Sequence, residues 1–174
     1  MNLANTSDYL KIAPFPSSQH ASEVVSDLRL SLQKNCRSCS SSALDWAPSI
    51  AASLEEISRN CSVTNWDGED ARAISSKVIS ITENVARSLY AILPNGTPSP
   101  DLLPEADGEM CLSWEPGDGR IFSLSLGVHN KMNYAGQLGV KGAVHGWQPI
   151  DVSNPWSFHT AIKEIAQYII RLYS

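Results

Sequence analysis

The fold is decided by the stretch EMCLSWEPGDGRIFSLSL, residues 109–126. Apolar and polar residues alternate on both sides of the central PGDG, and such alternation is typical of strands with one buried face. Proline, glycine and aspartate together are characteristic of a tight turn. The stretch therefore predicts an antiparallel hairpin, whose apolar face consists of Met110, Leu112, Trp114, Phe122, Leu124 and Leu126.

Two further strands follow the hairpin, at MNYAGQLG (132–139) and AVHGWQP (143–149). Their glycines, at positions 136, 139, 142 and 146, indicate bulges or the close approach of another backbone. Asn154 as N-cap and Pro155 at the first helical position then predict a last helix. Its apolar stripe is Phe158, Ile162, Ile165, Ile169 and Leu172.

Three helical patterns precede the hairpin. The first runs from Ser22 to about Asn35, the second carries apolar residues from Trp46 to Ile57, and the third carries them from Ile74 to Ile92. Residues 94–107 contain four prolines and predict a linker that no regular element crosses.

Helices followed by strands favour an α+β fold, an antiparallel meander of about four strands packed by helices. We expect an extended arm at residues 1–20, an N-terminal helical pair at 21–62 and an α+β core at 63–174. The helical pair and the core are expected to form one compact unit.

The net charge of the 174 residues is −5, and the basic residues form no run. Direct nucleic-acid binding is therefore disfavoured, and a protein partner with a basic surface suits the charge better. The first residues lack the pattern of a signal peptide, and no apolar run approaches the length of a membrane span. The sequence thus predicts a cytoplasmic protein with no membrane association.

Four short motifs resemble a pattern found in small, largely uncharacterised bacterial and phage proteins. They are NWDGEDARAIS (65–75), DGEMCLSWE (107–115), YAGQLG (134–139) and VHGWQPI (144–150), and the resemblance covers residues 65–172. It implies a shared core more than an activity. Glu69 and Asp70 depart from the pattern. The matching positions are Trp66, Asp67, Gly68, Asp107, Gly108, Trp114, Tyr134, Ala135, Gly136, His145 and Gly146.

The motif NWDGEDARA holds three acids, Asp67, Glu69 and Asp70, around one glycine. It lacks the alternating acids of a calcium loop, so no metal is expected there. We expect instead that Asp67 or Asp70 caps the third helix. Trp66 is expected to fill the core or to cover the seam between helix and sheet, rather than to bind a ligand.

The spacing of Cys36 and Cys39 is that of half a zinc site, but the second half is absent from the sequence. No cofactor is expected, and a metal at this pair is the alternative. His145 has two interpretations, a histidine hydrogen-bonded to a strand end or a general acid-base group.

No nucleophile elbow, Walker loop or dinucleotide fingerprint occurs in the sequence. The leading hypothesis is a non-enzymatic protein-binding module of antitoxin, immunity or inhibitor type, encoded by a bacterium, a phage or a mobile element. The alternative is a small enzyme or ligand-binding protein with His145, Tyr134 and an acid in one pocket. A third is a homodimer formed through a sheet edge. The expected partner-binding residues are Trp66, Asp67, Glu69, Asp70, Tyr134, His145 and Trp147.

Overall fold

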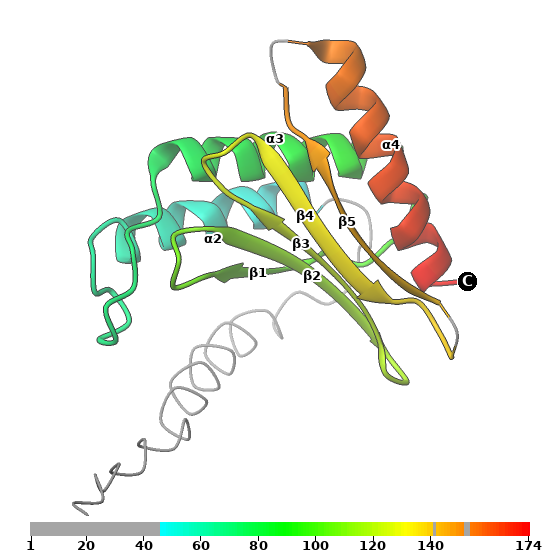
Figure 1. The fold of residues 1–174 in the computed structure, drawn as a ribbon, viewed down its shortest axis with the longest axis horizontal. Helices are drawn as coiled ribbons and strands as arrows, with labels where there is room; N and C mark the ends of the chain where they lie inside the picture. Colours follow the sequence, from blue (N-terminus) through cyan, green and yellow to red (C-terminus); the bar gives the residue numbers. More distant parts are fainter. Residues whose placement is uncertain (1–45, 141, 152–153) are drawn as a thin grey trace, which may run out of the picture. The chain divides into compact units, whose positions relative to one another are not determined.

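Three helices and five strands make up the described part of the chain, which in this computed structural model comprises residues 46–140, 142–151 and 154–174 (Figure 1). The fold is α+β with an antiparallel meander, as the sequence predicts. In chain order the elements are α2 (Ala47–Asn60), α3 (Ser76–Ile92), β1 (Asp101–Pro104), β2 (Met110–Gly117), β3 (Arg120–Leu126), β4 (Lys131–Gln137), β5 (Ala143–Pro149) and α4 (Pro155–Leu172).

The five strands form one sheet in the order β1-β2-β3-β4-β5, with every neighbouring pair antiparallel. The predicted hairpin is β2 and β3, in which Trp114 pairs with Phe122 before the register shifts at the turn. Because side chains alternate between the two sides of a strand, this register places all six predicted apolar residues on one side of the sheet. All six are fully buried there.

The meander has one strand more than expected. The prolines of residues 94–107 predict a linker, yet Asp101–Pro104 form strand β1 and pair with β2. Proline is compatible with a sheet edge, where one side of the strand needs no hydrogen-bond partner, and Pro104 ends this strand. Leu102 points into the core and supplies the apolar contact that holds the strand in place.

The helices pack on the apolar side of the sheet, which we call the inner side. Figure 1 shows α2 and α3 side by side, and α4 beside β5. Of the helices, α2 contacts the edge strand β1. A single apolar core joins all three helices to the strands. Asn154 caps α4 and Pro155 stands in its first turn, as predicted. None of the described helices is both long and apolar enough to span a membrane.

The predicted second helix is confirmed as α2, which ends at Asn60 and buries Ile50, Leu54 and Ile57. The described residues belong to one compact unit, which begins at Ser42 and so includes α2 together with the core. The predicted arm, the predicted first helix and the Cys36–Cys39 pair lie outside the described residues.

Candidate functional site

Trp66 lies in the loop between α2 and α3 and is partly buried against the apolar core. Its indole Nε1 donates a hydrogen bond of 2.9 Å to the carbonyl oxygen of Arg72. An indole with its N–H satisfied and its ring packed is a structural plug. The expectation that Trp66 fills the core is therefore supported by its contacts.

Asp67 orders the same loop. Its Oδ1 accepts hydrogen bonds from the backbone N–H of Glu69 at 2.8 Å and of Ala71 at 3.1 Å. The prediction that Asp67 or Asp70 caps the third helix is wrong, because Ser75 is the N-cap and accepts from the N–H of Val78. The chain needs several residues with positive φ in this loop, Asp70 among them, before the helix can begin.

The turn between β1 and β2 packs against this loop. The N–H of Arg72 donates to the carbonyl of Ala106 at 2.8 Å, and a Cβ on Gly108 would lie 3.3 Å from the carbonyl of Ala73. Asp107, whose Oδ1 accepts from the N–H of Glu109, belongs to this turn. We call Asp67, Glu69, Asp70 and Asp107, the acids of these two adjoining segments, the acidic corner.

Tyr134 lies on the inner side of the sheet. Its ring stacks on Phe122 with centroids 6.2 Å apart and lies 5.2 Å from the ring of Tyr168 on α4. A Cβ on Gly146 would stand 2.6 Å from the Tyr134 hydroxyl, so the glycine leaves room for this ring. A Cβ on Gly136 would stand 2.8 Å from the Ile121 carbonyl. The glycines therefore permit close packing, as expected.

A polar cluster closes the seam between β5 and α4. Glu164 accepts from the side-chain amide of Gln148 at 2.6 Å and from the Tyr168 hydroxyl at 3.3 Å. Hydrogen bonding to Tyr168, with burial and the charge of Glu164, raises the pKa of Tyr134 to about 12. These groups hold α4 against the strand edge.

The opposite side of β4 and β5 is exposed, and we call it the outer face. It carries Asn133, Ala135, His145 and Trp147, all of which are exposed. Trp147 is 58% exposed, and the ammonium of Lys131 lies 5.0 Å from its ring centroid. Trp147 pairs with Asn133, and the sheet continues from Asn133 and Ala135 into the serines of β3.

The register separates two residues that the enzyme hypothesis needs together. Tyr134 pairs with Gly146, and His145 pairs with Ala135. Neighbouring residues of a strand point to opposite sides, so Tyr134 and His145 lie on opposite sides of the sheet. The two side chains therefore do not face each other.

The expected partner-binding residues also do not form one surface. Asp67, Glu69 and Asp70 lie at the β1–β2 turn, and Trp66 and Tyr134 pack inward. Of the seven, only His145 and Trp147 share the outer face of β5, and three strands separate β5 from β1. The structure thus brings together two of the seven residues on one exposed face.

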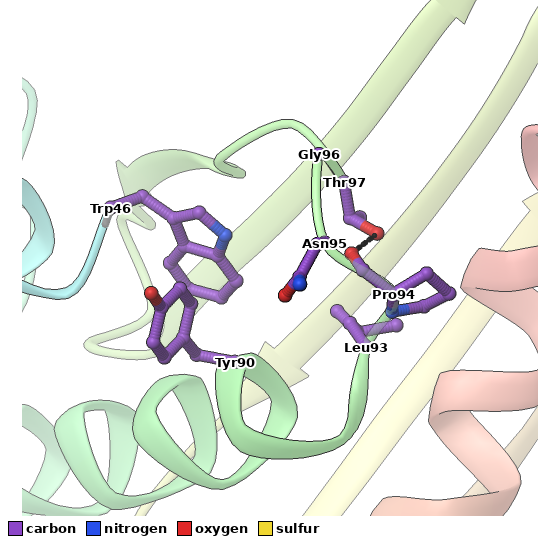
Figure 2. A pocket seen from close by; sticks show the side chains of 7 residues that line it. All are labelled: Trp46, Tyr90, Leu93, Pro94, Asn95, Gly96 and Thr97. Carbon is purple, nitrogen blue, oxygen red and sulfur yellow. Dashed lines mark hydrogen bonds between the residues drawn. The ribbon is translucent and has the colours of Figure 1, made fainter. Parts of the chain in front are cut away.

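A small pocket lies between the start of α2 and the turn after α3 (Figure 2). Trp46 and Tyr90 meet edge to face at 5.1 Å, and the side chain of Asn95 points toward them. The volume of 20 Å³ has room for about one water molecule. A second, open groove of 340 Å³ runs along α4 beside Lys163 and Glu164. The described residues that line the small pocket include no histidine, cysteine or carboxylate.

The two cysteines of the described residues, Cys61 and Cys111, are buried and free. Burial raises the pKa of both thiols, which disfavours the reactive thiolate. Within the described ranges, no three His, Cys, Asp or Glu side chains are grouped to hold a metal ion.

Comparison of the chain with protein-family models, with curated proteins and with solved structures finds no match. The assignment of roles therefore rests on the geometry of this chain. The sequence did not predict the contacts of Lys131 with Trp147 and of Gln148 with Glu164. The alternation of β5 could have indicated that Gln148 points to the side opposite Trp147.

Proposed function

We propose that the chain is a non-enzymatic protein-binding module of antitoxin, immunity or inhibitor type, and that it binds through the outer face of β4 and β5. The observation that carries the proposal is Trp147, which is 58% exposed on the outer face of the edge strand β5. Tryptophan is among the residues most enriched in the binding hot spots of protein interfaces.

The neighbours of Trp147 suit a protein partner. Asn133, Ala135 and the serines of β3 are shorter than the indole beside them, so that a partner can contact its exposed part. Lys131 and His145 add polar groups at its rim. Such a face offers broad, shallow contact rather than the concave pocket that small ligands require.

The charge distribution supports a partner with a basic surface. The chain carries a net charge of −5, and the acidic corner concentrates four carboxylates at one end of the sheet. Long-range attraction of this kind speeds association more than it strengthens the final complex. We therefore place the affinity at the outer face and assign only a steering effect to the acidic corner.

The test uses the tagged full chain as bait in extracts of the organism that encodes it, with mass spectrometry of the captured proteins. We expect one stoichiometric partner, lost with Trp147→Ala. The matched control is Trp156→Ala, because Trp156 is 84% exposed but belongs to α4. No stoichiometric partner, or a partner retained equally by both variants, would contradict the proposal.

A further inference from the structure

The two edges of the sheet differ in length. β1 has four residues, ends in Pro104 and contacts α2. β5 has seven residues, Ala143–Pro149, contacts α4 on its inner side and carries no Asp, Glu, Lys or Arg. In the described part of the chain, the outward backbone groups of β5 form no hydrogen bond, since those of its ladder all go to β4. Such an edge is a template for another strand.

The outer flank of this edge is apolar and the inner flank is acidic. Trp147 stands on the outer face, while Gln148 points inward to Glu164 at 2.6 Å. No Lys or Arg of the described residues lies within salt-bridge distance of Glu164, although its carboxylate borders the open groove along α4. A side chain opposite Gln148 on an added strand would stand about 5 Å away, within reach of that carboxylate.

We infer that the β5 edge binds an extended segment of the partner protein as a sixth strand, with a basic side chain toward Glu164 and an apolar one toward Trp147. The inference rests on the proposed function and specifies its binding mode. Main-chain hydrogen bonds supply affinity in this mode, and the alternating side chains supply specificity. The basic and the apolar residue are neighbours in the segment, because successive side chains of a strand point to opposite sides of the sheet.

A second copy of the chain fits this edge less well than a bare segment. Two paired strands lie about 4.8 Å apart, whereas packed helices need about 8–10 Å between their axes. Each copy would bring its own α4 and its own Glu164 to the same side of the joined sheet. The net charge of −5 on each copy adds repulsion. An extended basic segment meets neither obstacle.

The test is selection of phage-displayed random linear peptides on the immobilised full chain, followed by synthesis of the enriched peptides. We expect enriched peptides in which a basic residue stands next to an apolar or aromatic one. Hydrogen exchange should show that these peptides protect alternate backbone amides of Ala143–Pro149, those that point away from β4.

Two controls separate strand addition from nonspecific charge attraction. Glu164→Gln should weaken binding of the basic peptide by about tenfold, the usual effect of losing one charge-assisted contact. Glu115→Gln, which removes the same charge from the exposed end of β2, should leave binding unchanged. N-methylation of alternate peptide residues should abolish binding on the edge that pairs with β5 and have no effect on the other edge.

The inference is overturned if no peptide is enriched, if N-methylation on either edge has the same effect, or if light scattering shows a dimer that depends on β5. It is also overturned, while the proposed function stands, if the captured partner requires Trp147 but protects no amide of β5. Failure to capture any partner contradicts the proposed function. The peptide experiment then still tests whether the β5 edge binds an added strand.

Discussion

The inner and outer sides of β4 and β5 are built from alternate residues of the same two short segments, yet they meet opposite physical demands. On the inner side, Gly136 and Gly146 make room for aromatic rings. On the outer side, His145 and Trp147 are exposed. In the motifs YAG and HG, Tyr134 and the two glycines therefore serve packing on the inner side. The alternate residues, Ala135 and His145, lie on the outer side and are free to contact a partner.

Substitution at two adjacent residues of β3 tests this comparison most strongly. Phe122 is fully buried against Tyr134 and Tyr168, whereas its neighbour Ile121 is 37% exposed on the other side. We expect Phe122→Ala to lower the free energy of unfolding by about 3–5 kcal/mol, and Ile121→Ala by less than about 1 kcal/mol. Urea unfolding followed by fluorescence measures both.

Similar losses of unfolding free energy in the two variants would mean that both sides of β3 are equally buried in solution. The outer side of the sheet next to β4 would then be covered, which would contradict the exposed outer face that the proposed function requires. A change in the urea slope for Phe122→Ala alone would instead indicate a less compact native or denatured state.

The second test concerns the glycine of YAG. A Cβ at Gly136 would lie 2.8 Å from both the Ile121 carbonyl and the Phe122 ring, and the carbonyl belongs to a backbone that cannot move freely. We expect Gly136→Ala to destabilise the fold by about 1–3 kcal/mol. The control is Ala135→Ser on the exposed side, with a change below about 0.5 kcal/mol. Thermal unfolding measures both variants. Equal unfolding midpoints for Gly136→Ala and Ala135→Ser would contradict the packing explanation.

The alternation of EMCLSWE and RIFSLSL was sufficient to predict the hairpin and its buried face, because a period of two fixes which residues share a side. It could not show that Tyr134 and His145 lie on opposite sides of the sheet. That depends on the register between β4 and β5, which pairs Tyr134 with Gly146. A shift of one residue reverses every side chain, and the loop between the strands does not reveal the register.

Two other differences arise from competing local signals. Asp67 has the chemistry of a helix cap, but its carboxylate closes the loop, and Ser75 caps α3 eight residues later. Proline in residues 94–107 predicts a linker, but prolines at its ends are compatible with the edge strand β1. In the first case local hydrogen bonds within the loop decided between two arrangements that the sequence permits, and in the second case pairing with β2 did so.

The inner side should also show a dependence on alkaline pH. The folded state raises the pKa of Tyr134 from its ordinary value near 10 to about 12, with hydrogen bonding to Tyr168 as the largest cause. Folding therefore favours the protonated phenol. This contribution to stability is fully present below pH 10 and is lost as the pH rises from about 10 to about 12.

Tyr134→Phe retains the ring and removes the titrating group. We expect the free energy of unfolding of the variant to fall less steeply between about pH 10 and pH 12 than that of the unaltered chain. Equal slopes would show that the Tyr134 hydroxyl is not held in its inner-side contacts.

The smallest expected effect concerns the outer face, where Lys131 lies 5.0 Å from the ring centroid of Trp147. A double-mutant cycle of Lys131→Met and Trp147→Ala should give a coupling free energy of about 0.5–1 kcal/mol in urea unfolding, typical of an exposed cation–π pair. A matched cycle with Lys77→Met should give none, because the Lys77 ammonium donates to the Val128 carbonyl instead. A coupling of zero for Lys131 would mean that its ammonium does not lie on the indole in solution, so that this face of Trp147 would be free for the added strand.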